Sequence, residues 1–276
     1  MAAVNPDSPA DLLRRFGLKP KYSWGQNFLG DEHALKKIAD AVGLKKDDPV
    51  VELGPGLGHL TRALLATGAR VTAVERDRDM VRVLESMKLP GLTVVAGNAA
   101  EIDFAKTAGV DQIAVVGNLP YHLSSSILFE VLDQSQHVTK AVFTLQLEVV
   151  TRLAAAPGGR DYGLLSVLLG LRYEVELVFK LSRSLFHPPP NVDSAVVRLT
   201  RREKPAAEVT DEARFRKLVK AGFAHRRKTL LNSLKGDPVF KAMDLPAALL
   251  RAGIDGVRRA ETLSVAEFAA LERALG

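Results

Sequence analysis

The sequence predicts an α/β fold in which a mostly parallel sheet is followed by a small, all-helical C-terminal domain. Short β-rich apolar runs alternate with helical patterns from Val50 to about Leu147, as in sheets whose parallel strands are joined by right-handed helical crossovers. Beyond Thr200 no strand pattern returns, and apolar residues between Phe215 and Phe223 recur at helical spacing. A chain of 276 residues, 47% hydrophobic and 25% charged, is long enough for one large and one small domain.

Five apolar runs are expected to form the parallel part of the sheet. They cover residues 50–53, 70–74, 92–95, 113–116 and 141–145. Between the first two runs, apolar residues from Leu60 to Leu65 recur at helical spacing, and Gly68 stands where a helix C-cap would be. We therefore expect a helix to lead from the first strand to the second.

The end of the large domain is expected to carry a helix near residues 162–171 and strands at residues 173–179 and 194–199. A short proline-rich connection joins these two strands, so we expect them to pair antiparallel at the sheet edge. Residues 201–207 read as a linker, in which Pro205 breaks the strand pattern. The predicted domains are therefore residues 1–202 and residues 207–276.

Composition excludes several classes of protein. The chain has no cysteine, which excludes disulfides, thiolate metal ligands and a cysteine nucleophile. Residues 1–9 lack the basic-then-apolar layout of a signal peptide. The longest apolar stretch, around residues 164–171, is too short to span a bilayer. We expect a soluble, cytoplasmic monomer that does not bind a membrane and uses no metal ion.

Positive charge is concentrated in the helical tail. The net charge is +6 and the isoelectric point is about 9.5. One stretch without any Asp or Glu contains Arg214, Arg216, Lys217, Lys220, Arg226, Arg227, Lys228 and Lys235. Such clustering indicates a polyanionic partner, and the alternative is a solvated helix face.

A glycine-rich loop follows the first predicted strand. Gly54, Gly56 and Gly58 let the backbone turn tightly and approach a ligand, with amides at the start of the next helix facing it. A dinucleotide-binding loop is the obvious alternative, but the G-x-G-x-G spacing differs from the G-x-G-x-x-G of pyrophosphate binders. Glu52 precedes the loop, and S-adenosylmethionine has no phosphate to be cradled. The loop therefore favours S-adenosylmethionine as the cofactor.

Two further strand ends carry polar residues that could meet this cofactor. Glu75 ends the second strand, where a carboxylate can accept hydrogen bonds from both ribose hydroxyls; the alternative is a surface acid in the charge run of residues 75–78. Asn98 follows the third strand and could meet the edge of the cofactor's adenine, although a lone Asn there is more often a turn residue.

The segment Asn118-Leu119-Pro120-Tyr121 follows the fourth strand and suits an adenine base. The exocyclic amine of adenine is a poor nucleophile, because its lone pair is delocalised into the ring. The amide oxygen of Asn118 and the backbone carbonyl of Leu119 could accept its N–H groups and free that lone pair. Pro120 fixes the local backbone, and Tyr121 can stack on the extruded base. Methyl transfer to the amine of adenine is the reaction we infer, with a structural strand-to-turn segment as the alternative.

At this point the chain resembles a known family, the ribosomal RNA adenine N6,N6-dimethyltransferases, and especially its bacterial small-subunit members of the kasugamycin-resistance type. The resemblance covers nearly the whole chain. It rests on residues 25–29 (Gly-Gln-Asn-Phe-Leu), 52–58, 118–121, the proline-rich loop 186–195, and segments 225–230 and 259–264 in the tail. It implies a Rossmann-like S-adenosylmethionine-dependent methyltransferase sheet.

The resemblance also implies site residues. Those that would contact the cofactor are Asn27, Leu29, Gly54, Glu75, Asn98 and Asn118. Catalysis would involve Asn118, Leu119, Pro120 and Tyr121, with Tyr121 and Phe186 flanking the base. RNA would be held by Arg226, Arg227 and Lys228.

Four positions depart from the family pattern. Asn98 stands where Asp is usual, His122 where Asn is common, Trp24 where Phe is usual, and Asn191 where Lys is usual. His122 is not expected to act as a general base, because the attacking amine can lose its proton to water after methyl transfer.

The expected function is dimethylation of two adjacent adenosines in a 3′-terminal hairpin loop of small-subunit ribosomal RNA, late in subunit assembly. Unpaired loop bases suit this chemistry because they cost less to extrude. One alternative is a large-subunit methylase of the macrolide-resistance type, which shares the catalytic logic. Another is an assembly factor that binds the immature subunit and whose methylase activity is not essential.

Overall fold

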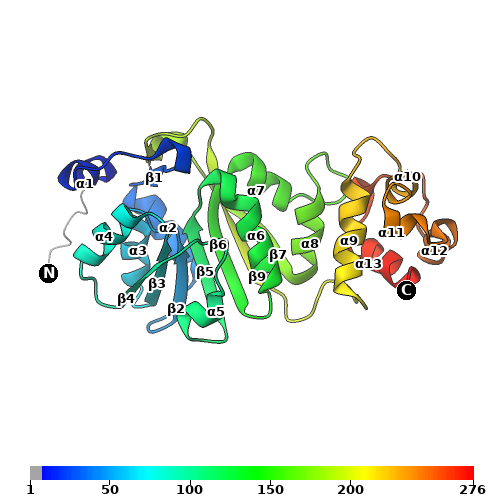
Figure 1. The fold of residues 1–276 in the computed structure, drawn as a ribbon, viewed down its shortest axis with the longest axis horizontal. Helices are drawn as coiled ribbons and strands as arrows, with labels where there is room; N and C mark the ends of the chain where they lie inside the picture. The colour runs from blue at the N-terminus through cyan, green and yellow to red at the C-terminus, as the bar shows by residue number, and fades with distance from the viewer. Residues whose placement is uncertain (1–7) are drawn as a thin grey trace. The chain divides into compact units, whose positions relative to one another are not determined.

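The computed structural model describes residues 8–276. Residues 1–7, which belong to the segment where no signal peptide is expected, lie outside the described residues. The chain forms two compact units (Figure 1). The first contains the described residues up to Val150 together with Glu176–Arg201, and the second contains Thr151–Val175 and Arg202–Gly276.

All seven strands predicted for the sheet are present within the described residues. They form one seven-stranded sheet in the order β4-β3-β2-β5-β6-β9-β7. The strands are β2 (Pro49–Leu53), β3 (Arg70–Glu75), β4 (Leu92–Ala96), β5 (Ile113–Asn118), β6 (Val138–Gln146), β7 (Tyr173–Leu181) and β9 (Ser194–Arg201). The pairs among β2 to β6 are parallel, and β9 runs antiparallel to β6. The last two predicted strands are neighbours at one edge, as expected.

Helices α2 (Glu32–Val42) and α3 (His59–Leu65) bury a cluster that includes Ile38 and Leu64 against inward valines of the sheet, such as Val71 and Val116. The other helices that connect the strands are α4 (Arg78–Ser86), α5 (Phe104–Ala108) and α6 (Ser124–Asp133). One detail of the α3 prediction is wrong, because its C-cap is Ala66 and Gly68 takes its positive φ of 87° in the turn that follows.

A second, two-stranded sheet was not predicted from the sequence. Strand β1 (Phe28–Leu29) pairs antiparallel with β8 (Phe186–His187), which matches Leu29 with Phe186. Before β1 lie helix α1 (Pro9–Arg15) and the short turn η1 (Tyr22–Trp24). The apolar residues of α1 pack with Phe28 against the glycine loop and α4. We call residues 8–29 the N-terminal arm, and β1 joins this arm to the proline-rich loop.

The second unit is helical. Its elements are α8 (Leu164–Arg172), α9 (Glu212–Phe223), α10 (Leu230–Leu234), α11 (Pro238–Lys241), α12 (Leu245–Arg251), η4 (Ala260–Thr262) and α13 (Val265–Ala274), and α7 (Leu147–Leu153) spans the boundary between the units. The sequence assigned residues 151–175 to the first domain, whereas the structure groups them with the helices. The ring of Tyr162 packs edge-on against Phe223, and Ala206 N–H donates to Leu171 O at 2.9 Å. These contacts bring α8 into the core of the helical unit.

Helix α13 of this unit begins with a capping box and an ion pair. Ser264 Oγ accepts from Glu267 N–H, the Glu267 carboxylate accepts from Ser264 N–H at 2.8 Å, and Arg258 donates to the same carboxylate. The hydrogen bond from Arg258 is the main reason that the pKa of Glu267 falls from 4.5 to about 2. Each of these bonds favours the ionised carboxylate.

We predict that this carboxylate makes the helical unit sensitive to acid. Its folded pKa lies below 4.5, so its contribution to stability is complete above about pH 4.5 and is lost as the pH falls towards 2. Gln retains the capping box but has no charge to lose. Glu267→Gln should therefore lose less stability than the parent in this interval, as measured by urea unfolding. Glu203→Gln, at an exposed position of the same unit, should behave like the parent; equal losses for all three proteins would contradict the prediction.

Candidate active site

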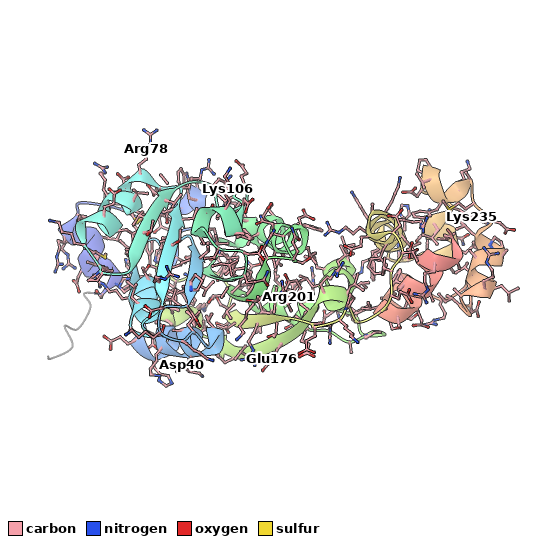
Figure 2. All side chains as sticks on the ribbon, turned by 90° about the horizontal axis from the view of Figure 1, so that it is seen from below. Asp40, Arg78, Lys106, Glu176, Arg201 and Lys235 are labelled. Atoms are coloured by element: carbon pink, nitrogen blue, oxygen red, sulfur yellow. The ribbon has the colours of Figure 1, made fainter. Side chains whose placement is uncertain are left out.

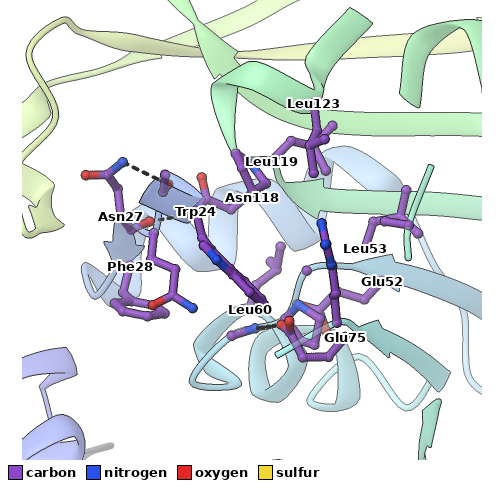
Figure 3. Close-up of a pocket in the computed structure, with 18 of the residues that line it drawn as sticks. Trp24, Asn27, Phe28, Glu52, Leu53, Leu60, Glu75, Asn118, Leu119 and Leu123 are labelled. Carbon is purple, nitrogen blue, oxygen red and sulfur yellow. Dashed lines mark hydrogen bonds between the residues drawn. The ribbon is translucent and has the colours of Figure 1, made fainter. Parts of the chain in front are cut away.

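A cavity lies where the parallel strands of the first unit end, and Figure 3 shows residues that line it. Its wall combines the N-terminal arm, the glycine loop, the ends of β3 and β5, and the residues after β4. The predicted cofactor and catalytic residues all line this one cavity: Asn27, Leu29, Gly54, Glu75, Asn98, Asn118, Leu119, Pro120, Tyr121 and Phe186. Segments distant in sequence meet because parallel strands present their carboxyl ends at one edge of the sheet.

The glycine loop is held to the end of β3 by Glu75. Gly56 N–H donates to Glu75 Oε2 at 3.0 Å (Figure 3), and Asp77 N–H donates to Glu75 Oε1 at 2.8 Å. Gly56 has φ of 55°, and a Cβ there would lie 2.9 Å from Phe28 Cε1. Burial raises the pKa of Glu75, and the backbone donors oppose that rise. The carboxylate is therefore fixed in position, and each oxygen keeps a second lone pair for a ligand.

Glu52 adds a second buried acid to the cavity. Its side chain is 1% exposed and accepts a hydrogen bond from Thr61 Oγ1 at 2.6 Å. Burial raises its pKa to about 8, and the nearby charge of Glu75 adds to the rise. With a pKa of about 8, Glu52 is mostly protonated at neutral pH, and a cationic ligand beside it would lower this pKa and favour the ionised form.

The amide of Asn118 is oriented by the N-terminal arm. Asn118 Nδ2 donates to Asn27 O at 2.9 Å, and Asn27 Nδ2 donates to Gly25 O at 3.1 Å (Figure 3). Because the nitrogen of Asn118 is committed to the arm, the amide acts towards a ligand through Oδ1, its acceptor. The N-terminal arm therefore determines that the oxygen of the Asn118 amide, and not its nitrogen, is available to a ligand.

The two aromatic residues expected to flank a base are fixed in different ways. Tyr121 forms a hydrogen bond between its hydroxyl and Ser194 Oγ at 2.8 Å, and burial raises its pKa. Phe186 is 5% exposed and packs in the same hydrophobic cluster as Leu29 and Ile38. Tyr121 therefore presents a half-buried ring to the cavity, whereas Phe186 forms a rigid part of its wall.

Asn98 lines the cavity but is also part of a local turn. Ala100 N–H donates to Asn98 Oδ1 at 3.3 Å, and Asn98 Nδ2 donates to Glu101 Oε1 at 2.6 Å. This is the hydrogen bonding of a turn residue, and Oδ1 keeps a second lone pair for a ligand. Asp at this position would place a second carboxylate beside Glu101, whereas the amide of Asn98 donates to it.

The structure also shows contacts between the N-terminal arm and Asp77 that the sequence did not indicate, and we call these contacts the latch. Lys21 Nζ contacts Asp77 Oδ1 at 2.6 Å, and Gln26 Nε2 donates to Asp77 Oδ2 at 2.8 Å. Asp77 is 2% exposed at its side chain. The latch ties the arm to the N-cap of α4, and its only trace in the sequence is the charge run of residues 75–78.

The latch places Trp24, the only tryptophan of the chain, in the cavity wall. Lys21 Nζ lies 5.2 Å and Arg76 Cζ lies 5.0 Å from the centre of its ring. Two cations beside one indole hold it through cation–π attraction. Its fluorescence is therefore a direct probe of this cavity.

The residues expected to bind RNA belong to the second unit. Arg226, Arg227 and Lys228 are exposed in the turn between α9 and α10. Two hydrogen bonds connect this turn to neighbouring loops, from Arg226 Nη2 to Arg160 O at 2.9 Å and from Leu230 N–H to Arg258 O at 2.7 Å. Three loops that carry arginine therefore meet at the turn.

Two further searches concern the described residues only. Among residues 8–276, no group of three or more His, Asp or Glu side chains is placed to hold a metal ion. In the same range, no helix has both the length and the apolar character needed to cross a membrane.

Comparison with known proteins gives consistent results. A family described as ribosomal RNA adenine dimethylase matches residues 17–275. A protein from Myxococcus xanthus named ribosomal RNA small subunit methyltransferase A is 67% identical over 98% of this chain and 96% of its own. A protein of the same name from Anaeromyxobacter dehalogenans is 53% identical over 98% of both chains.

Solved structures give the same indication. A dimethyladenosine transferase from Plasmodium falciparum has a TM-score of 0.74 and 27% identity, covering 88% of this chain and 95% of its own. The 23S rRNA methyltransferase ErmE has a TM-score of 0.69 and 31% identity, covering 90% of this chain and 99% of its own. The predicted Rossmann-like methyltransferase fold is confirmed.

We predict that Glu52 makes the stability of the first unit decline as the pH rises from about 4.5 towards 8. Its folded pKa of about 8 lies above 4.5, so its contribution to stability is complete below pH 4.5 and declines as the pH rises towards 8. Glu52→Gln retains an acceptor for Thr61 and has no proton to lose. Urea unfolding across this interval should show a decline for the parent that is smaller in the variant. Glu85→Gln, at an exposed position, is the control, and identical slopes for Glu52→Gln and the parent would refute the assignment.

Proposed function

Since the chain belongs to the ribosomal RNA adenine dimethylase family, we propose that it methylates the N6 amines of two adjacent adenosines in a 3′-terminal hairpin loop of small-subunit ribosomal RNA. The chain is a methyltransferase, and the choice of RNA rests on its relatives. The observation that carries the proposed reaction is the orientation of Asn118, whose Nδ2 is bound to Asn27 O at 2.9 Å and whose Oδ1 is the acceptor available to an amine.

The cofactor that we propose is S-adenosylmethionine. A bound cation would favour the ionised forms of the buried acids Glu52 and Glu75, whereas a phosphate beside them would raise their pKa further, so the pair favours S-adenosylmethionine over a dinucleotide. Asn27, Leu29 and Gly54 would hold its amino-acid end and methyl-bearing region, and Glu75 and Asn98 its nucleoside. S-adenosylmethionine supplies the electrophilic methyl group of the reaction.

The residues of this chain position and activate the amine. Asn118 Oδ1 and the Leu119 carbonyl accept its two N–H groups, so that the nitrogen lone pair is released from the ring and directed towards the methyl carbon. Pro120, with φ of −57° and ψ of 129°, fixes the direction of the backbone between them. The proton of the attacking amine leaves to water, and no side chain needs to remove it.

The adenine ring is positioned by Tyr121 and Phe186. Tyr121 stacks on its face, an interaction that contributes about 1–3 kcal/mol per base in comparable sites. The hydroxyl bond from Tyr121 to Ser194 keeps the ring from rotating out of the cavity. Phe186 provides a fixed apolar wall. The cavity therefore selects a flat base with an exocyclic amine.

The helical unit is proposed to bind the RNA backbone. Arg226, Arg227 and Lys228 are exposed and can contact phosphates, which position an RNA without reading its sequence. The substrate in this proposal is an immature small ribosomal subunit in the cytoplasm. We propose that the chain acts as a monomer.

Two alternatives remain testable. The likeness to the 23S rRNA methyltransferase ErmE keeps large-subunit RNA as a second candidate substrate, although the small-subunit methyltransferase from Myxococcus xanthus is much more similar in sequence. The other is an assembly factor whose methylase activity is not essential. Incorporation of labelled methyl groups into immature small and large subunits, followed by mapping of the modified nucleotides, distinguishes all three.

We predict that Asn118→Ala and Tyr121→Ala each lower turnover by about 100-fold or more, as expected for loss of a polarising or positioning group. Tyr121→Phe retains the ring and loses only the bond to Ser194, so it should be much less affected. Single-turnover methylation of immature subunits measures these rates. Trp24 fluorescence checks that the variants still bind the cofactor, and near-normal turnover of Asn118→Ala would rule out the mechanism.

We predict that replacing Arg227 and Lys228 with Ala weakens RNA binding and flattens its salt dependence by roughly 0.7–0.9 log unit per lost phosphate contact. Arg226→Ala is a separate variant, since Arg226 also holds Arg160 O. Filter binding at several salt concentrations measures the slope. Lys241→Ala, exposed on α11, is the matched control, and an unchanged slope in the double variant would show that these residues form only a solvated face.

A further inference from the structure

A second hollow lies beside the proposed active site, and nothing above assigns it a function. It is lined by Gln146, Leu147, Glu148, Arg183, Asn191, Val192 and Asp193, all from the first unit. These residues come from the end of β6, the start of α7, the turn η3 (Arg183–Leu185) and the end of the proline-rich loop. Most of them are polar, so the hollow is not a gap in the hydrophobic core.

The hollow is directly connected to the group that holds Tyr121. Gln146 is the partner of Ser194 in the pairing of β6 with β9, and Ser194 Oγ is 2.8 Å from the Tyr121 hydroxyl. The next residues on each side, Leu147 and Asp193, are joined by a hydrogen bond from Leu147 N–H to Asp193 O at 3.0 Å. Ser194, which holds the hydroxyl of Tyr121, is therefore next in sequence to Asp193 of the hollow.

The wall of the hollow is ordered by its own hydrogen bonds. Arg183 N–H donates to Asp193 Oδ1 at 3.0 Å, which partly satisfies that carboxylate. Arg183 Nη1 donates to Asn191 O at 3.3 Å, which directs the guanidinium along the rim. Arg183 bonds to the backbone oxygen of Asn191, so this bond does not involve the side-chain amide of Asn191. Val192, the next residue, is 46% exposed.

The chemistry of the lining matches a nucleotide. A guanidinium is the preferred side-chain partner of a phosphate. The amides of Gln146 and Asn191 can each donate and accept, as the edge of an unpaired base requires. Val192 offers an apolar surface to the base. Two carboxylates also line the hollow. Asp193 accepts the Arg183 N–H, which offsets part of its charge, and Glu148 disfavours a second phosphate and favours a base that carries an amine.

We infer that this hollow binds the nucleotide next to the target adenosine, with Arg183 at its phosphate and Gln146 and Asn191 at the edge of its base. This inference rests on the proposed function, because it places an RNA strand across the cavity. Ser194 connects Tyr121 to the hollow, so a nucleotide adjacent to the one held by Tyr121 can reach it. With two adjacent adenosines as substrate, the occupant is the other adenosine of the pair in one of the two methylations, because that adenosine lies on the 3′ side of one target and on the 5′ side of the other.

The test uses the full chain and immature small subunits whose RNA carries adenosine, guanosine or uridine next to the target adenosine. Single-turnover rates over a range of subunit concentrations give KM and kcat for Arg183→Ala, Asn191→Ala and the parent. The parent should prefer adenosine as the neighbour. Asn191→Ala should raise KM by about 10-fold for the adenosine neighbour and so reduce the preference, while kcat changes little. Arg183→Ala loses a phosphate contact, so it should raise KM by a similar factor for all three neighbours.

Three controls make the outcome specific. Asn191→Ala leaves the Arg183 bond to the backbone of residue 191 in place, so a misfolded loop is not an explanation for its effect. Arg78→Ala removes an exposed arginine of α4 that projects away from the ribbon (Figure 2) and should behave like the parent. Trp24 fluorescence should show unchanged cofactor binding in every variant.

The inference is wrong if the parent has no preference for the neighbouring nucleotide, or if Asn191→Ala keeps the preference of the parent. Either result, with methylation still occurring at the expected adenosines, leaves the proposed function intact. Failure of the parent to methylate any small-subunit adenosine would instead overturn the proposed function itself.

Discussion

The bare backbone of Gly56 is the constraint on which the cavity depends. A side chain there would meet Phe28 Cε1 at 2.9 Å, so the glycine allows the N-terminal arm to lie directly on the cofactor loop. The same residue donates to Glu75, which fixes the loop against the end of β3. Phe28 and Leu29 form β1, and β1 pairs with the strand that carries Phe186. Because Gly56 has no Cβ, the glycine loop, the N-terminal arm and the proline-rich loop can pack together.

Charge organises the same region. Glu52, Glu75 and Asp77 are all buried, and they gather near the ends of β2 and β3. Lys21 and backbone N–H groups compensate Asp77 and Glu75, whereas Glu52, with a pKa of about 8, is mostly protonated at neutral pH. A cationic cofactor would favour the ionised form of these acids and a phosphate would oppose it, so the fold biases the cavity towards a positively charged cofactor. The hydrogen bonds from Lys21 and Gln26 to Asp77 also hold the N-terminal arm against the start of α4.

The catalytic segment is coupled to two parts of the chain that are far away in sequence. Asn118 is oriented by Asn27 of the arm, and Tyr121 is held by Ser194 of β9. Ser194 is next to Asp193, which orders the wall of the second hollow. The groups that would activate an amine, stack on a base and receive the adjacent nucleotide thus share one hydrogen-bonded framework. Its rigidity is what an in-line reaction between two substrates requires.

The sequence by itself determined the features whose signals are local. Alternating apolar runs located the strands of the sheet, and the G-x-G-x-G spacing and the Asn-Leu-Pro-Tyr segment located part of the cavity wall, because each depends on short-range geometry. Asn27, Leu29 and Phe186 were expected only from the resemblance to the family. Tertiary structure decided the rest. Strands β1 and β8 have two residues each and no periodicity, so only their pairing defines them. Residues 151–175 join the helical unit through the packing of Tyr162 on Phe223. Contacts between distant segments, such as Lys21 with Asp77, leave no pattern in a single sequence, because their energy depends on burial that only the folded chain creates.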